Sequence, residues 1–346
     1  MCGTFDLTYR CNFGCAHCYV GHLVGQKRSE ARELDTGQVV DLLEQAADAG
    51  CLMMLLSGGE PLLRDDFAQA YTSARRLGMI VTVFTNGSLV RPQHLEAFGE
   101  YPPHEVEVTL YGATEETYER VTGVPGSYWS VRRGIEQLLG AGVRVGLKSM
   151  ILRDNVHEIE TMAELARDLN VRYRVDPLVT ARLDGNRAPL AGRVEPEFAA
   201  ELETSVGEWA LNMARFLGRQ RVAAGLDPVP PERMFRCGAG QASFHLDPAG
   251  SMHPCLMSPS IGCDTLSGGF QAAWESTKAA VDGATWTEGG RCAGCPMVLV
   301  CGYCPGLMVL EGTSPSRPPE YVCRLGECRS RFIGVEVPGV IGVTAG

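Results

Sequence analysis

The sequence predicts an α/β fold of six strand–helix units, followed by a smaller cysteine-rich region. Short apolar runs alternate with amphipathic stretches from about residue 4 to residue 178, and nine of the fourteen cysteines fall between Cys237 and Cys328. Such alternation implies parallel strands joined by right-handed crossovers, in either an open doubly wound sheet or a partial barrel. At 346 residues the chain exceeds the ~100–200 residues of a typical domain, so we expect a large domain and a smaller one.

Six apolar runs beside turn signals are predicted strands, over residues 3–8, 52–57, 80–85, 106–110, 143–151 and 173–177. Helical patterns separate them over 36–49, 65–77, 92–98, 127–139 and 155–169, and two more helices are predicted over 197–221 and 270–282. Helical periodicity is otherwise scarce beyond Cys237, so we expect metal ions to organise this region more than a hydrophobic core does. The expected divisions are the α/β domain over 1–182, a helical bridge over 183–236, the cysteine-rich domain over 237–332 and a tail over 333–346.

The net charge of −10 and the lack of a long basic run argue against a surface for nucleic acid or anionic lipid. The N-terminus lacks the charged leader and apolar core of a signal peptide, and no apolar stretch approaches the ~18 residues of a membrane span. We therefore expect a cytoplasmic protein without nucleic-acid or membrane partners. Because cytosolic thiols are kept reduced, the clustered cysteines indicate metal binding rather than disulfides. Cys2 and Cys51 lie outside the clusters and are interpreted as ordinary cysteines.

Cys11, Cys15 and Cys18 form a C-x3-C-x2-C pattern directly after the first predicted strand. Three thiolates on one short loop can bind three irons of a four-iron cluster and leave the fourth iron without a protein ligand. The alternatives are a zinc knuckle and accidental clustering. Structural zinc sites need four closed ligands and commonly show paired C-x2-C spacing, so the pattern favours an iron–sulfur cluster with one open iron.

This triad resembles that of the radical S-adenosylmethionine (SAM) superfamily, whose members carry it after the first strand of a partial (β/α)6 TIM-like barrel. The resemblance implies a barrel of that kind in which Cys11, Cys15 and Cys18 hold a [4Fe–4S] cluster and SAM chelates the open iron. An electron supplied by a donor such as ferredoxin or flavodoxin would then cleave SAM to a 5′-deoxyadenosyl radical. The resemblance also implies that Tyr19, which follows the last cysteine, lies near the adenine.

The segment Ser57-Gly-Gly-Glu-Pro61 follows the second predicted strand, where the superfamily has a G-G-E motif. Glycines let backbone carbonyls approach a ligand, and a carboxylate can pair with an ammonium group. We therefore expect Gly58, Gly59 and Glu60 to contact the amino group of SAM. The segment alone would indicate only a tight turn into a helix, but its position one strand–helix unit after the triad favours SAM binding.

Polar residues also stand near the ends of later predicted strands, where barrels hold their ligands. Thr109 and Ser149 are candidates to hydrogen-bond the ribose or the carboxylate of SAM, and Lys148 is a candidate to pair with that carboxylate. Asn86, in Thr85-Asn-Gly87, is a further candidate SAM contact. The alternative, that local contacts satisfy these polar groups, stays open.

The C-terminal cysteines resemble those of the SPASM domain, which carries two auxiliary clusters in peptide-modifying radical SAM enzymes. With this region the resemblance covers residues 4–328. It implies that auxiliary cluster I is bound by Cys237, Cys255 and Cys304. It also implies that auxiliary cluster II is bound by Cys292, Cys295, Cys301 and Cys323.

This region departs from the SPASM pattern in two ways. The four-cysteine run ends Cys301-x2-Cys304 in place of the usual C-x3-C, and Phe244 and His245 stand where many relatives have an extra cysteine. The remaining ligand of cluster I is therefore open between Cys263, Cys328 and an outside group such as a substrate thiolate. A zinc ribbon remains an alternative for this region, although five residues are a short separation for two zinc knuckles.

The predicted function is oxidation of a ribosomally made peptide, with formation of a thioether or another cross-link. The chain begins at the first predicted strand, so we expect a separate protein to recognise the leader of the peptide. Sulfatase maturation is disfavoured because Leu256 stands where those maturases have an aspartate base. The alternatives are a cofactor-pathway enzyme similar to a haem-precursor decarboxylase, and a non-catalytic iron–sulfur or zinc-binding scaffold.

Overall fold

The computed structural model describes residues 1–23, 33–205, 233–286, 291–314 and 316–332. Its centre is one sheet of nine strands in the order β6-β5-β4-β3-β2-β1-β7-β8-β9. Neighbouring strands from β6 through β7 run parallel, whereas β8 is antiparallel to β7 and to β9. In the described part of the chain, no helix is long and apolar enough to cross a membrane.

All six predicted strands are present and adjacent in chain order. They are β1 (Cys2–Asp6), β2 (Met53–Ser57), β3 (Ile80–Thr85), β4 (Glu105–Thr109), β5 (Val145–Met150) and β6 (Arg172–Asp176). Every residue of β4 is buried, as is typical of a parallel strand that is covered on both faces. The α/β class and its parallel sheet are confirmed.

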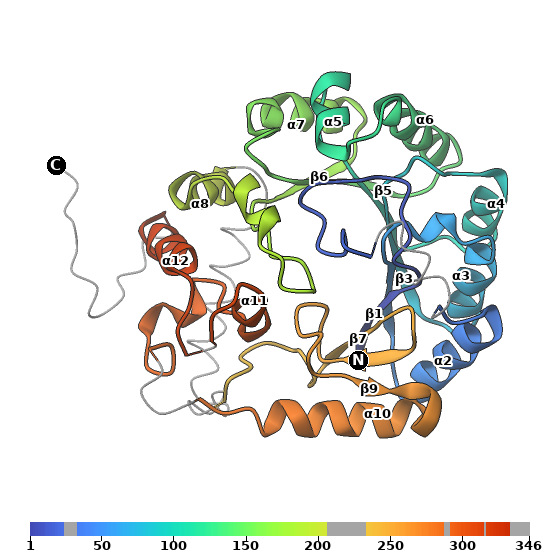
Figure 1. Cartoon of the computed structure of the whole chain (residues 1–346). Helices are drawn as coiled ribbons and strands as arrows, with labels where there is room; N and C mark the ends of the chain where they lie inside the picture. Colours follow the sequence, from blue (N-terminus) through green and yellow to red (C-terminus); the bar gives the residue numbers. More distant parts are fainter. Residues whose placement is uncertain (24–32, 206–232, 287–290, 315, 333–346) are drawn as a thin grey trace.

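Six helices lie on the outer side of the curved sheet (Figure 1): α2 (Thr36–Asp48), α3 (Phe67–Arg76), α4 (Pro92–Glu100), α5 (Glu115–Thr122), α6 (Ser127–Gly140) and α7 (Ile159–Asp168). A doubly wound sheet would have helices on both faces, so this arrangement agrees better with the predicted partial barrel, which stays a prediction. Helix α5 is absent from the sequence prediction. Two threonines, Thr117 and Thr122, share its buried face with Tyr118 and Val121, which weakens the apolar pattern.

Local sequence explains where these helices begin. Helix α2 starts at a capping box, in which the Asp35 carboxylate accepts from the Gln38 N–H and the Gln38 side chain accepts from the Asp35 N–H. Helix α4 starts at a proline, which fits the first turn because the missing N–H has no partner there. The apolar faces of these helices then pack on the sheet.

The cysteine-rich region extends the same sheet. Strand β7 (Ser243–Leu246) pairs with β1 on the side opposite β2. Gly3 permits this close packing, because a Cβ atom there would lie 2.5 Å from the ring of Phe244. Phe244 in turn contacts Phe270, with 5.0 Å between the ring centroids. The antiparallel strands that follow are β8 (Ser251–His253) and β9 (Cys263–Asp264).

The C-terminal helices correct the expectation that helices are scarce beyond Cys237. Helix α10 (Thr265–Asp282) has a non-helical Gly269 (φ 79°, ψ 167°), so its regular part begins at the predicted residue, whereas α11 (Pro305–Leu310) and α12 (Glu320–Phe332) are not predicted. Phe244, Met252 and Phe270 are buried within the main core. Apolar packing therefore contributes to the order of residues 243–282, while the expected organisation by metal stays a prediction.

Two buried ion pairs connect α8 (Pro196–Ser205) and the segment just before it to the C-terminal helices. Arg193 pairs with Glu311, and their side chains are only 7% and 2% exposed. The Arg329 guanidinium donates to both oxygens of Glu203, at 2.7 and 2.6 Å. Of the helix predicted over 197–221, the structure has α8 (Pro196–Ser205); residues 206–232 and the tail lie outside the described residues. The predicted domain boundaries stay a prediction.

The substitution Arg193→Met should destabilise the protein, because it leaves the Glu311 carboxylate buried without its counter-charge. Breaking a buried pair in this way costs about 3–5 kcal/mol in the free energy of unfolding. Arg324→Met is the matched control, since its pair with Glu197 is exposed on both sides and such pairs contribute little to stability. Denaturant unfolding of the anaerobically purified proteins measures both; equal shifts of the two midpoints would contradict the prediction.

Candidate active site

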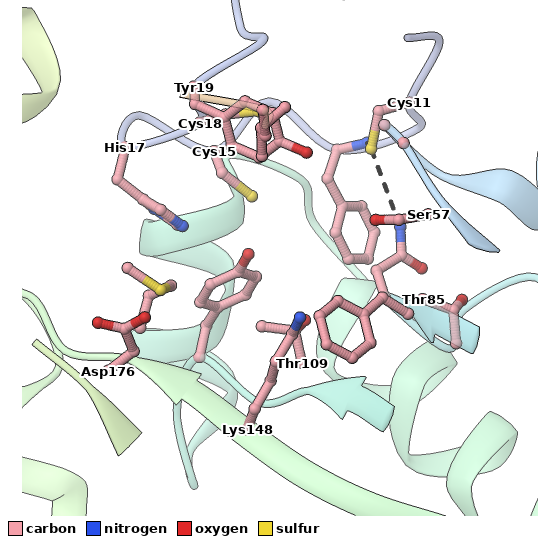
Figure 2. Close-up of a pocket in the computed structure, with 18 of the residues that line it drawn as sticks. Cys11, Cys15, His17, Cys18, Tyr19, Ser57, Thr85, Thr109, Lys148 and Asp176 are labelled. Atoms are coloured by element: carbon pink, nitrogen blue, oxygen red, sulfur yellow. Dashed lines mark hydrogen bonds between the residues drawn. The ribbon is translucent and has the colours of Figure 1, made fainter. Parts of the chain in front are cut away.

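A cavity of about 390 Å³ opens where the parallel strands end, and residues from β1 to β6 line it. In Figure 2, Cys11, Cys15 and Cys18 lie along one side of this cavity, and Thr109, Lys148 and Asp176 lie on the opposite side. The volume falls in the range of small-molecule sites. The position at the carboxyl ends of the strands is where barrels bind their ligands.

The loop that carries the three cysteines is held by backbone contacts that only glycine allows. The Gly59 N–H donates to the Thr8 carbonyl at 2.7 Å, and the Glu60 N–H donates to the Arg10 carbonyl at 2.8 Å. A Cβ atom at Gly58 would lie 2.2 Å from the Thr8 carbonyl oxygen, and one at Gly59 would lie 2.3 Å from that of Arg10. Both glycines also line the cavity, so they have a structural role beside the predicted one.

The Glu60 carboxylate is fully buried and braces the ends of two strands. It accepts from the Leu62 N–H at 3.0 Å, from the Thr85 hydroxyl at 2.7 Å and from the Asn86 N–H at 2.7 Å. Burial raises its pKa to about 7, and the three donors act in the opposite direction. Glu60 is thus engaged by its own chain, while its predicted pairing with the SAM ammonium stays a prediction.

The three cysteines of the triad are partly exposed, and all three line the cavity. Burial raises the pKa of Cys11 to about 12 and also raises that of Cys15, on which the charges of Cys18 and Cys11 act in the same direction. Thiolates that repel one another in a buried site favour a bound cation between them. Among the described residues, no three metal-binding side chains lie close enough together to bind a single metal ion. A four-iron cluster is larger than one ion, so its ligands stand further apart.

The other candidate SAM contacts all line the cavity, with different freedom to bind a ligand. The Asn86 amide donates to the Asn12 side chain at 2.9 Å and lies 4.0 Å from the Cys11 sulfur, so it helps to order the cysteine loop. The Ser149 hydroxyl donates to the Leu110 carbonyl and accepts from the Tyr173 hydroxyl, so local contacts already satisfy it. Thr109 and Tyr19 also lie at the cavity surface.

Lys148 belongs to a charged group at the cavity wall. Its ammonium nitrogen lies 3.5 Å from the Glu107 carboxylate and 3.3 Å from the centre of the Phe84 ring. Burial lowers its pKa to about 8, although Glu107 opposes this. Arg174 also binds Glu107, with its Nε donating at 2.7 Å. Arg172 binds Glu107 as well, at 3.0 Å, and also pairs with Glu105. Three cations thus contact the Glu107 carboxylate, so the wall is suited to an anionic ligand group.

Sequence reasoning missed several residues that line the cavity: Asp6, Tyr111, Arg174 and Asp176. For Asp6 a signal was present, because a carboxylate at the end of an apolar strand is buried only for a reason. Tyr111 and Asp176 carry no pattern that separates them from ordinary strand-end residues. His17 also lines the cavity and contacts the edge of the Tyr111 ring at 4.9 Å between centroids.

The structure brings together Cys237, Cys255 and Cys304, the three predicted ligands of auxiliary cluster I. Burial raises the pKa of Cys304 to about 11, and the nearby charges of Cys255 and Cys237 add to this. Gly306 permits the chain after Cys304 to pack against the chain after Cys255, because a Cβ atom at Gly306 would lie 2.1 Å from the Met257 carbonyl oxygen. Leu256, next to Cys255 in the chain, lines the cavity.

The predicted ligands of auxiliary cluster II, Cys292, Cys295, Cys301 and Cys323, also lie together. Burial raises the pKa of Cys301 to about 12, and the charges of the other three act in the same direction. Gly326 of α12 lets that helix approach, because a Cβ atom there would lie 2.5 Å from the Cys301 Cβ. Cys328 accepts from Arg331 within the same helix and is buried in the main core, against which Cys263 also packs.

The substitution Gly59→Ala should displace the cysteine loop, because backbone carbonyls surround the new methyl group and must move. We expect a cost of about 1–3 kcal/mol in the free energy of unfolding and a lower iron content. Gly99→Ala in α4 is the matched control; nothing lies within 4 Å of its Cβ position, so iron content should stay unchanged. Equal iron per chain in the two anaerobically purified variants would contradict the prediction.

Comparison with known proteins identifies the family. Residues 5–166 match the model of the radical SAM superfamily. Mycofactocin maturase MftC of Mycolicibacterium smegmatis is 28% identical over 343 residues, which cover 93% of this chain and 82% of that protein. The PqqA peptide cyclase of Gluconobacter oxydans is 30% identical over 262 residues, covering 72% and 68% of the two chains.

The fold comparison agrees. The crystal structure of Streptococcus suis SuiB bound to S-adenosylmethionine superposes with a TM-score of 0.71 at 14% identity, covering 93% of this chain and 76% of that chain. At this identity the likeness concerns the fold alone. Together with the matched sequence family and the cysteine loop at the cavity, it leads to one conclusion: the chain belongs to the radical SAM superfamily.

Proposed function

We propose that this radical SAM enzyme oxidises a ribosomally made peptide by closing a thioether or another cross-link within it. The observation that carries the proposal is the position of Leu256, next to Cys255, in the wall of the cavity that the cysteine triad also lines. One cavity would thus lie between the site of radical formation and a second redox centre. The similarity to a mycofactocin maturase and a PqqA peptide cyclase supports a peptide as the substrate.

Membership of the family implies a [4Fe–4S] cluster and SAM, which together supply a 5′-deoxyadenosyl radical for hydrogen-atom abstraction. Cys11, Cys15 and Cys18 would bind this cluster, and the thiol chemistry of the loop fits three of its irons. Gly58 and Gly59 hold the loop in place and would present backbone groups to SAM. Lys148 would hold a carboxylate at the far wall.

Two auxiliary clusters are part of the proposal. The grouping of Cys237, Cys255 and Cys304 supports one, and the grouping of the other four cysteines supports the second. The first group offers three thiols, whereas Cys328 is buried in the main core, against which Cys263 packs. A thiolate of the substrate remains our candidate for the fourth ligand, since a [4Fe–4S] cluster usually takes four.

The proposed partners follow from this chemistry. The enzyme needs an electron donor such as ferredoxin or flavodoxin, and a separate protein would recognise the leader of the peptide. A cytoplasmic location, where thiols stay reduced, suits the many free cysteines. A cofactor-pathway activity is the second candidate, and it predicts product formation from a small molecule with no change in the mass of any peptide.

Replacing all three triad residues, Cys11→Ala, Cys15→Ala and Cys18→Ala together, should remove about one cluster's worth of iron and abolish 5′-deoxyadenosine formation. The reason is that SAM loses the iron that binds and reduces it. Cys51→Ala is the control, because this buried thiol donates to the Met53 carbonyl and lies outside the cavity. Iron analysis and chromatography after anaerobic incubation with SAM are the measurements. Cleavage of SAM by the triple variant at the parental rate would refute the assignment.

The substitution Glu60→Gln should weaken SAM binding by roughly tenfold or more, because loss of a charge-assisted hydrogen bond costs ~1.5–3 kcal/mol. The new amide N–H₂ would also face a donor, either the Asn86 N–H or the Thr85 hydroxyl. Glu100→Gln is the control, since that carboxylate is exposed at the end of α4. Anaerobic titration calorimetry measures the SAM affinity. An unchanged affinity would remove Glu60 from the binding site.

A further inference from the structure

Asp6, at the end of β1, has a buried carboxylate with one unused oxygen. The residue is 0% exposed to solvent, yet it lines the cavity. Its Oδ2 lies 3.1 Å from the Nε2 of His245, whereas its Oδ1 has no hydrogen-bond partner among the described residues. A buried carboxylate oxygen without a partner is costly, so its retention at a cavity surface indicates a role with a ligand.

The pairing of β1 with β7 creates this contact between residues that are far apart in the chain. Thr4 pairs in register with His245, so the imidazole stands beside β1 on the face that carries Thr4 and Asp6. Alternate residues of a strand share one face, and both Thr4 and Asp6 line the cavity. His245 is 2% exposed, and its Nδ1 has no partner in the described part of the chain.

The surroundings of Asp6 contain other titratable groups but, among the described residues, no lysine or arginine in ion-pair contact with it. Its charge raises the pKa of Tyr9 and Tyr19, for which burial is the larger cause, and it acts on Cys18 as well. The His253 ring lies near His245, at 5.7 Å between centroids. The pair is thus a buried carboxylate and imidazole whose charge acts on two phenols and on Cys18 of the cysteine loop.

We propose that Asp6, positioned by His245, accepts the proton that the substrate loses during its oxidation. This inference rests on the proposed function and deepens it. Closing a C–S bond from a C–H and an S–H group removes two electrons and two protons from the substrate. The adenosyl radical takes one hydrogen atom, and an oxidised iron–sulfur cluster takes the other electron. The second proton needs an acceptor at the cavity, and the free Oδ1 of Asp6 provides one.

Asp176 is the competing carboxylate at the cavity wall. Its Oδ1 accepts from the Leu178 N–H at 3.0 Å, and it stands on β6, at the opposite edge of the parallel sheet from β7. Asp6 stands beside β7, and the chain runs from β7 through β8 to Cys255 and Leu256, toward the proposed electron acceptor. Proton and electron would therefore leave the substrate on the same side of the cavity.

The test uses the full chain loaded with its clusters, incubated anaerobically with SAM, a reductant and a peptide translated from a short cysteine-containing reading frame next to its gene, deuterated at its side chains. Asp6→Asn should lower the yield of modified peptide by about 100-fold or more, the scale of general acid–base catalysis, with 5′-deoxyadenosine formation and deuterium transfer into it kept within about threefold. His245→Gln should raise the ratio of 5′-deoxyadenosine to product by roughly tenfold, and Asp6→Glu should restore part of the yield. A merely structural role would lower both products together.

Asp282→Asn, a half-exposed carboxylate bound to Arg233 outside the cavity, is the matched control and should leave the ratio unchanged. A wild-type ratio of 5′-deoxyadenosine to modified peptide in the Asp6→Asn variant would overturn the inference while the proposed function stands. A raised ratio in Asp176→Asn instead would do the same. If the Asp6→Asn variant loses iron, the His245→Gln variant is the test. A wild-type ratio of 5′-deoxyadenosine to product in that variant overturns the inference. If the wild-type enzyme does not change the mass of the peptide, both proposals fail.

Discussion

The site depends on one contact between two pieces of backbone. Residues 58–60 lie against residues 8–10 so closely that a single methyl group would part them, and two N–H···O bonds join the segments. From there the Glu60 carboxylate reaches the end of β3, whose Asn86 reaches back to the cysteine loop. The loop is therefore braced from two neighbouring strands before any cofactor binds, which lowers the ordering cost that binding would otherwise carry.

Strand β1 has an equally central place, because it pairs with β2 on one side and β7 on the other. The α/β part and the cysteine-rich part consequently share one sheet and one core, and they are further joined by buried ion pairs between α8 or its preceding segment and the C-terminal helices. Rigid coupling of this kind suits chemistry in which a radical and an electron acceptor must keep a constant separation. It also explains why residues from both parts line the cavity.

Sequence patterns predicted those elements whose signal is local. The apolar run of β3 was located residue for residue, and Phe270 was located as the first regular residue of its helix because Gly269 interrupts the pattern. Helix α12 was not predicted because Gly326, Cys328 and Arg329 occupy its buried face and weaken the apolar pattern. These residues are there for tertiary contacts, such as the close approach of Gly326 to Cys301. The cysteine loops could be predicted from the spacing of the cysteines alone. The Asp6–His245 contact could not be predicted in this way, since it depends on the pairing of two strands whose contacting residues are 239 positions apart in the sequence.

The position of β7 also has a consequence for how the chain is made. Synthesis delivers β1 long before β7, so β1 presents an unpaired hydrogen-bonding edge until residue 246 has left the ribosome. Such edges recruit other extended chains, and long-range strand pairing is slow. A nascent or truncated chain that stops before β7 would thus carry an unpaired strand edge beside a loop of three free thiols. Protection of that edge, by a chaperone or by rapid completion of the chain, is part of what this architecture requires from the cell.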